Sequence, residues 1–334
     1  MTAITGPTFP RFADAYRAVL SAIRDTPSYH TVTRAKTAIE TLNVSFTLLD
    51  PVDRTPYIAA RKTNIVFNHA EALWYLLGRD DLAMIAYYAP TLRRLSMDGL
   101  TLTGTAYGPR LFAADGPDRK SQYGRVVELL RRDPDTKRAT MMIMRADELV
   151  DRDNPDVACT LGLQLMLRDG RLQMSAYMRG NDAVIGLLGD TFAFTFIQEF
   201  TARQLRVEVG SYAHHVGSMH INVNDLDKVD AMLTEPGGPT FAAAAMPKTS
   251  WLELADVASW EERLRHNHAS FTADECHGLD PYWVEVVALF EVYRQISHEP
   301  DRPVSEAALG MLRPGHRWLV EQRWPARMPQ PVTR

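Results

Sequence analysis

The chain has 334 residues, of which 46% are hydrophobic and 23% are charged, and its formal net charge is −4. This composition is typical of a globular enzyme with a sizeable core, and it excludes a disordered chain. Without a basic surplus, nucleic acid is not an expected partner, and any phosphate must be bound by a local site. Two cysteines are too few for a disulfide framework and favour a reducing, cytoplasmic location. We expect neither a signal peptide nor a membrane span, because no suitable apolar run is present.

The first third of the chain predicts helix, strand and helix. Apolar residues at helical spacing predict an amphipathic helix over 11–24, and alternation predicts a strand over 43–48. Asn64 is a suitable N-cap for a further helix, which Gly78 would end.

Glu71 lies among the apolar residues of that further helix. A carboxylate with apolar neighbours should have a raised pKa, as a general acid or base requires. The alternative is a glutamate at the rim of the fold, paired to Arg61 or Lys62, and the pattern alone favours this alternative.

The middle of the chain begins with Tyr107, which lies in a turn-rich loop. A helix is predicted over 124–132, and a strand over 139–144 follows a break rich in Asp and Pro. Lys137 and Arg138 stand at the start of this strand. A basic pair at a strand edge is usually solvated.

The stretch from Cys159 to Asp190 contains most of the side chains that could react with or bind a substrate. An apolar strand follows Cys159 and turns back at 169–170, an Asp-Gly pair typical of a type I′ hairpin. The return strand ends in Arg179 and Asp182. A nucleophile, an anion-binding arginine and two carboxylates therefore lie within about thirty residues.

Each of these residues also has a structural interpretation. Cys159 can be an inert buried thiol, or a nucleophile if a cation such as Arg179 favours the thiolate. Arg179 can be a surface residue of a strand. Asp190 precedes a predicted helix over 191–205 and would be a good N-cap, which is the reading that the pattern alone favours.

The last part of the chain predicts a strand that ends near residue 224, and helices over 225–233 and 282–296. No chemistry is evident after the first of these helices. The pairs at 214–215 (His-His) and 276–277 (Cys-His) lack the spacing and further ligands of a zinc site, so we expect no metal. No nucleotide-binding glycine motif is present. Without repeats or linkers, residues 1–334 are predicted to form a single domain.

Three segments, EALWYLLG, GTAYGPR and MRGNDAVIGLLGD, resemble the thymidylate synthase family, and most closely its cytidylate hydroxymethylase branch. The resemblance covers about residues 34–235, which leaves an elaborated C-terminal part. It implies an α/β fold, the thymidylate synthase fold, with a large mixed β-sheet flanked by helices and a homodimer formed through the sheet. In length and motifs the whole chain resembles the CMP hydroxymethylases of nucleoside-antibiotic biosynthesis.

The resemblance also implies roles for single residues. Cys159 would be the nucleophile and Glu71 the group that moves protons. Tyr107 would line the site, and Asp182 would hold the folate ring. Asn181 would bind the substrate.

A second set of residues would bind the phosphate of the nucleotide. Arg179 matches a family arginine that contacts the phosphate, although Gly180 replaces the serine that follows it in thymidylate synthases. Arg34 lies near a further phosphate-binding position. Lys137 and Arg138 would reach the nucleotide of the neighbouring subunit, so that the two subunits share their active sites.

The base is predicted from Asp190 and Thr160. Thymidylate synthases have asparagine where Asp190 stands, and the cytosine-modifying branch has aspartate. A carboxylate only accepts hydrogen bonds, so it suits the 4-amino group and a protonated N3 of cytosine and would repel O4 of uracil. Thr160 replaces the histidine that follows the cysteine in thymidylate synthases. The resemblance therefore predicts cytosine.

The sugar is predicted from three positions. His220 resembles the family histidine that contacts the sugar. Asn222 stands where the family has a tyrosine that binds the 3′-hydroxyl, and Ala176 is also small. Both small side chains leave room for a 2′-hydroxyl, which favours CMP over dCMP.

The predicted reaction is 5-hydroxymethylation of CMP with 5,10-methylenetetrahydrofolate and water, through a covalent adduct of Cys159 at C6. Thymidylate synthases carry tryptophans near the folate, and the matching segment 87–99 has none. Water rather than hydride is therefore expected to complete the reaction. The alternatives are a phage-type dCMP hydroxymethylase, a thymidylate synthase, and a family member that binds nucleotide without catalysis.

Overall fold

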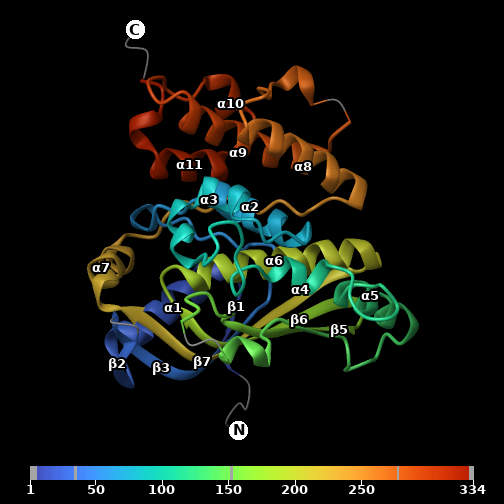
Figure 1. The fold of residues 1–334 in the computed structure, drawn as a ribbon. Coiled ribbons are helices and arrows are strands. Elements are labelled where there is room, and N and C mark those ends of the chain that lie inside the picture. Colours follow the sequence, from blue (N-terminus) through green and yellow to red (C-terminus); the bar gives the residue numbers. More distant parts are fainter. Residues whose placement is uncertain (1–5, 34–35, 151–152, 277, 331–334) are drawn as a thin grey trace.

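The computed structural model describes residues 6–33, 36–150, 153–276 and 278–330. Figure 1 shows a β-sheet with helices stacked on one side of it. The strands are β1 (Thr8–Phe9), β2 (Tyr29–Thr33), β3 (Lys36–Leu48), β4 (Thr140–Met142), β5 (Thr160–Arg168), β6 (Arg171–Asp182) and β7 (Glu208–Asn222). The helices are α1 (Phe12–Asp25), α2 (Ile65–Leu76), α3 (Leu82–Tyr88), α4 (Tyr107–Phe112), α5 (Gln122–Arg132), α6 (Gly186–Leu205), α7 (Leu226–Thr234), α8 (Trp251–Arg265), α9 (Pro281–His298), α10 (Glu306–Gly310) and α11 (Pro314–Arg323).

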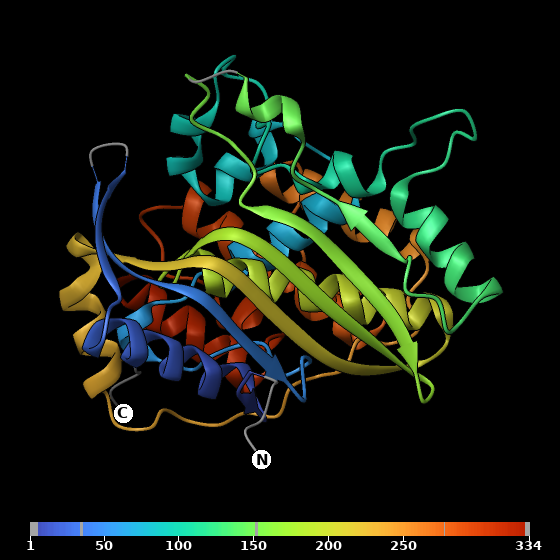
Figure 2. The same cartoon turned by 90° about the horizontal axis from the view of Figure 1, so that it is seen from below.

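The sheet is mixed and runs in the order β1-β3-β7-β6-β5-β4, with β2 paired to β3. The β1–β3 and β6–β7 pairs are parallel and the others are antiparallel. Figure 2 looks onto the face of the sheet that lies away from most of the helices. This mixed sheet flanked by helices is the architecture that the sequence predicted.

Most predicted elements are present, with boundaries shifted by a few residues. The predicted first helix is α1, and Asn64 caps α2 by accepting a hydrogen bond from the Phe67 N–H (3.1 Å). The hairpin between β5 and β6 turns at Asp169 and Gly170, whose φ angles of 50° and 71° are both positive, as a type I′ turn requires. The predicted strand over 139–144 is shorter, since β4 contains three residues.

The N-cap interpretation of Asp190 is wrong. Helix α6 begins at Gly186, with Ile185 as its N-cap residue, so Asp190 lies in the second turn. The chain enters the helix early because the Asp182 carboxylate accepts hydrogen bonds from the Val184 and Ile185 N–H groups (2.8 and 2.9 Å). Asp182 thus fixes the turn before α6, although the helix itself has no side-chain N-cap.

Helix α2 lies between α6 and the C-terminal helices, as Figure 1 shows. All but one of its residues are buried, because other helices pack against it on both sides. The C-terminal helices α9 and α11 therefore complete the surroundings of α2, and the buried side chains of α8 to α11 belong to the same hydrophobic core as those on the sheet. This layer keeps the helix that carries Glu71 away from water.

Candidate active site

Cys159 lies directly before β5, beside Arg179 on β6. The backbone N–H of Arg179 donates to the Cys159 carbonyl (2.9 Å), and its Nη2 lies 3.7 Å from the Cys159 Sγ. The guanidinium is held there by hydrogen bonds to the carbonyls of Ala158 (2.8 Å) and Val157 (3.1 Å). A fixed cation beside a partly buried thiol favours the thiolate, which is the nucleophilic form.

Glu71 and Asp190 approach each other from α2 and α6. Glu71 is 8% exposed, and burial, reinforced by the negative charge of Asp190, raises its pKa to about 8. Burial raises the pKa of Asp190 to about 7. A Cβ at Gly189 would lie 3.4 Å from the Glu71 Oε2, an ordinary contact distance, so Gly189 on α6 lies directly beside the Glu71 carboxyl group. The predicted rise of the Glu71 pKa is confirmed, and the pairing with Arg61 or Lys62 is wrong.

Tyr75 and Tyr107 connect this carboxyl pair to the cysteine. The Tyr75 hydroxyl hydrogen-bonds to Glu71, and its ring stacks on Tyr107 (5.1 Å between centroids). Burial raises the pKa of Tyr107, and charges on Asp190, Cys159 and Glu71 raise it further, so its hydroxyl lies within electrostatic reach of the three groups. Tyr75 was not among the predicted site residues, although its i+4 spacing from Glu71 places both residues on one face of α2.

A series of buried, hydrogen-bonded polar side chains leads from Asp190 into the interior of the protein. Asn181 hydrogen-bonds to the Asp190 carboxylate, and its Nδ2 lies 3.2 Å from the Nε2 of His214. The His214 Nδ1 lies 2.7 Å from the Tyr212 hydroxyl. Because an amide nitrogen only donates, Nε2 accepts and the ring proton is on Nδ1. Burial lowers the pKa of His214 to about 3, so the ring is neutral and the chain of donors is fixed.

Asp182, Asn222 and His220 lie together at the end of the paired strands β6 and β7. The Asn222 Nδ2 donates to the Asp182 carboxylate (2.6 Å), and both residues line a hollow of about 330 Å³. An adjoining hollow of about 420 Å³ is lined by Thr31, Ala38, Glu40, Arg179, Gly180, Ser218 and His220. The structure thus brings the predicted folate, sugar and phosphate residues to one end of the sheet.

Phosphate binding in the second hollow needs further cations. Arg179 shares it with the Glu40 carboxylate, to which the Ser218 hydroxyl donates a hydrogen bond. Lys137 and Arg138 are exposed near the far end of β5. The Leu165 N–H donates to the Ala139 carbonyl, so this basic pair lies six residues along the strand from Cys159, at roughly 20 Å. Within one chain they do not reach the site, and their predicted role in a partner's site stays a prediction.

One further predicted residue is not brought to the site. Ala176 is fully buried and pairs with His214 on β7, whereas His220 pairs with Asp182, six residues further along β6. The placement of Ala176 therefore gives no support to its predicted contact with the sugar. Arg34 lies outside the described residues.

Glu71→Gln should lower turnover by roughly 10² to 10⁴ while nucleotide affinity changes little. The amide keeps the shape of the side chain, but it neither takes up nor releases a proton, and general acid–base catalysis contributes about this factor. Steady-state rates together with calorimetric nucleotide binding would check this expectation. Equal losses of turnover and affinity would instead show that Glu71 acts only in binding.

Among the described residues, no set of three His, Cys, Asp or Glu side chains is placed to hold a metal ion. In the same part of the chain, no helix has the length and apolar character needed to cross a membrane.

The site geometry fits an enzyme that works through a covalent cysteine adduct, and comparisons with known proteins identify its family. The chain belongs to the thymidylate synthase family, whose model, described as "Thymidylate synthase", matches residues 12–259. This match extends beyond the 34–235 predicted from the motifs.

Similar proteins include deoxyuridylate hydroxymethyltransferases of phages. That of Bacillus phage SP01 is 31% identical over 84% of this chain and 77% of its own length. That of Pseudomonas phage M6 is 30% identical over 66% of this chain and 64% of its own. The thermostable thymidylate synthase A of Bacillus subtilis has a similar fold, with a TM-score of 0.59 at 18% identity over 72% of this chain and 90% of that one. The predicted thymidylate synthase fold is therefore confirmed.

Proposed function

We propose that the protein hydroxymethylates C5 of the cytosine in CMP, with 5,10-methylenetetrahydrofolate as the one-carbon donor. The observation that carries this proposal is the placement of the Asp190 carboxyl beside Glu71, with the Tyr107 hydroxyl in reach of both and of Cys159. A base reader, a proton carrier and a nucleophile are thus collected in one place. The presence of both Cys159 and Glu71 argues against a family member that only binds nucleotide.

The chemistry uses these groups in sequence. The Cys159 thiolate adds to C6 of the pyrimidine, which makes C5 a carbon nucleophile. The folate supplies a one-carbon unit at the oxidation level of formaldehyde. C5 attacks the methylene carbon, whose bond to N10 of the folate breaks. Glu71 then accepts the C5 proton, the remaining bond from this carbon to N5 breaks, and tetrahydrofolate leaves an exocyclic methylene group on the pyrimidine. Water then adds to the exocyclic carbon, the bond between Sγ and C6 breaks, and the thiolate is restored. CMP, methylenetetrahydrofolate and water thus give 5-hydroxymethyl-CMP and tetrahydrofolate, without net oxidation.

The residues around the folate position fit this co-substrate. Asp182, which would hold the folate ring, lines the hollow of about 330 Å³ beside Asn222. Segment 87–99, which matches the segment that carries tryptophans near the folate in thymidylate synthases, has none. A folate position without these indole rings would be less closed to water. Open surroundings favour addition of water over hydride transfer, which supports hydroxymethylation over a thymidylate synthase reaction.

The uracil of dUMP is the second candidate base, because the phage relatives are named as deoxyuridylate hydroxymethyltransferases. A pKa near 7 means that Asp190 is partly protonated at neutral pH. A protonated carboxyl group can donate to O4 of uracil, whereas the carboxylate repels it. Asp190 therefore excludes uracil less strictly than an always-ionised aspartate would. Asn181 counteracts this by hydrogen-bonding to the charged form and favouring cytosine.

The phosphate site supports a homodimer with shared active sites. Arg179 alone, beside Glu40, provides little net positive charge for a phosphate dianion. Lys137 and Arg138 from a second subunit would supply the remainder. Exposed apolar side chains on the strands, such as Leu42, Leu161 and Tyr177, support packing through the sheet. Sugar preference, CMP over dCMP, rests on the small Asn222 beside His220, and a cytoplasmic location rests on the two cysteines.

The folate product tests this proposal. Turnover with CMP should release tetrahydrofolate and no dihydrofolate, because the one-carbon unit is not reduced. Chromatography of the folates after complete turnover, with the nucleotide analysed by mass, would measure both products. Formation of dihydrofolate with a methylated base would contradict hydroxymethylation and leave a thymidylate synthase-type reaction.

A further inference from the structure

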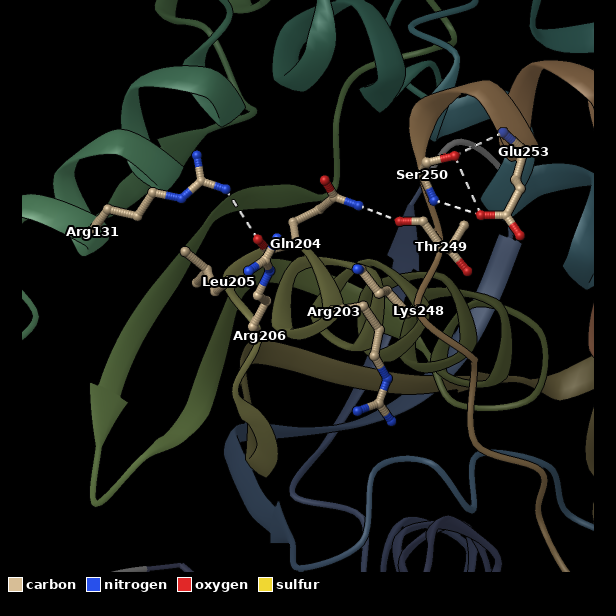
Figure 3. Close-up of a pocket in the computed structure, with 9 residues that line it drawn as sticks. All are labelled: Arg131, Arg203, Gln204, Leu205, Arg206, Lys248, Thr249, Ser250 and Glu253. Atoms are coloured by element: carbon tan, nitrogen blue, oxygen red, sulfur yellow. Dashed lines mark hydrogen bonds between the residues drawn. The ribbon is translucent and has the colours of Figure 1, made fainter.

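A third hollow, of about 570 Å³, lies far from the active site, where α5, the end of α6 and the segment before α8 meet. Figure 3 shows Arg131 and Lys248 reaching it from opposite sides, with the last turn of α6 between them. Asp190 and Arg203 are thirteen residues apart on α6, so the two places are separated by roughly 20 Å. The hollow is lined by Arg131, Arg203, Gln204, Leu205, Arg206, Lys248, Thr249, Ser250 and Glu253.

Its charges are unbalanced. The one carboxylate in the lining, Glu253, is engaged with Ser250 in a capping box at the start of α8 (2.9 and 3.1 Å). Arg131 donates to the Gln204 carbonyl (3.0 Å). In the part of the chain that the structure describes, the side chains of Arg206 and Lys248 have no hydrogen bond or ion pair with a protein group. Cations that converge without counter-charges repel one another, and a bound anion relieves that repulsion.

The end of α6 explains only part of this cluster. Arg203 and Arg206 lie near the negative end of the helix dipole, which any helix C-terminus favours. Arg203 is further accounted for, since it donates to the Met246 carbonyl (2.8 Å) and lies 3.7 Å from the Glu199 carboxylate. Arg131 comes from α5 and Lys248 from an extended segment, so the dipole accounts for neither.

Arg206 also stands where the backbone favours glycine. It ends α6 with φ 59°, a left-handed conformation that glycine adopts most easily. An arginine in this conformation makes the folded state less stable than a glycine would. Its side chain is also one of the cations with no protein partner. A functional role for that cation would account for the exception.

We propose that this hollow binds a small polyphosphate anion, such as the polyphosphate group of a nucleotide. Three cations from three segments match several linked phosphates better than a single phosphate. The lining has no aromatic side chain, and Leu205 is its one large apolar residue. The anionic group rather than a base would therefore provide the contacts.

This site is tested by titrating the full chain with inorganic tripolyphosphate and measuring the heat of binding by calorimetry at a fixed low salt concentration. Arg206→Gly should weaken binding by roughly tenfold or more, the effect of losing one charge-assisted hydrogen bond. Arg119→Gly is the matched control, because Arg119 is also exposed and left-handed (φ 54°) but does not line the hollow. Both variants lose one charge and relieve one strained backbone position, so both should fold.

The proposal requires that Arg119→Gly binds like the natural protein and that Lys248→Gln weakens binding as Arg206→Gly does. If Arg119→Gly weakened binding equally, the loss of one positive charge anywhere on the protein would explain the result, and the proposed site would be overturned. No binding of tripolyphosphate, or binding of an RNA oligonucleotide alone, would overturn it as well. Neither CMP nor folate is present in this experiment, so its outcome is independent of the proposed catalytic function.

Discussion

Cys159→Ser should lower turnover by at least about 10⁴-fold, because the other catalytic groups act on an adduct that only the nucleophile can form. The serine hydroxyl is a far weaker nucleophile than the thiolate that Arg179 stabilises (Nη2 to Sγ, 3.7 Å). Nucleotide affinity should persist, because the Arg179 guanidinium is also held by the carbonyls of Val157 and Ala158. Product formation and nucleotide binding, measured on the same preparation, check both statements.

The chain offers its own control for this prediction. Cys276 is the other cysteine, and its Sγ donates to the Thr272 carbonyl (3.4 Å) away from the described site. Cys276→Ser should therefore leave turnover unchanged. Mass spectrometry of denatured protein quenched during turnover should find the nucleotide adduct on Cys159. Substantial turnover by Cys159→Ser would show that the reaction does not need a covalent adduct.

Asp190→Asn should shift the base preference from cytosine toward uracil by roughly tenfold to a hundredfold, the value of one hydrogen bond to a charged group gained or lost. The amide donates to O4 of uracil, which the carboxylate repels. The ratio of kcat/KM for CMP to that for dUMP measures this change. An unchanged ratio would mean that another residue reads the base.

The natural protein should show the same effect as a function of pH. The pKa of Asp190 is raised to about 7, so its carboxylate form predominates above neutrality and its protonated form below. Only the carboxylate rejects uracil, so the preference for CMP over dUMP should increase as the pH rises from about 6 to 8. Asp190→Asn has no such titration, and its ratio should stay constant over this range.

The order of helices and strands could be predicted because each has a strong local signal, such as the Asn64 cap and the Asp169-Gly170 turn. The assignment of Asp190 as an N-cap failed because the nearest Gly-Asp pair was taken as the helix start. The observed helix begins four residues before Asp190, after a turn in which the Asp182 carboxylate accepts two backbone N–H groups. Local pattern could not decide between these two aspartates.

The surroundings of the site were less predictable, since they depend on contacts between distant segments. The chain from Tyr212 through His214 and Asn181 to Asp190 joins β7, β6 and α6, and no spacing in the sequence indicates it. Glu71 was placed correctly in an apolar helix, but the C-terminal helices that bury α2 carry no recognisable motif. Motifs thus predicted the reacting groups, and the packing that sets the pKa values of Glu71 and Asp190 required the structure.

A competition assay tests the central claim most directly. Equal concentrations of CMP, dCMP and dUMP are incubated with 5,10-methylenetetrahydrofolate and the natural protein, and the products are identified by mass. We predict 5-hydroxymethyl-CMP in excess, with Asp190 selecting the base and the space beside Asn222 accepting the 2′-hydroxyl. Hydroxymethylated dUMP in excess would contradict the assignment of Asp190 as a cytosine reader.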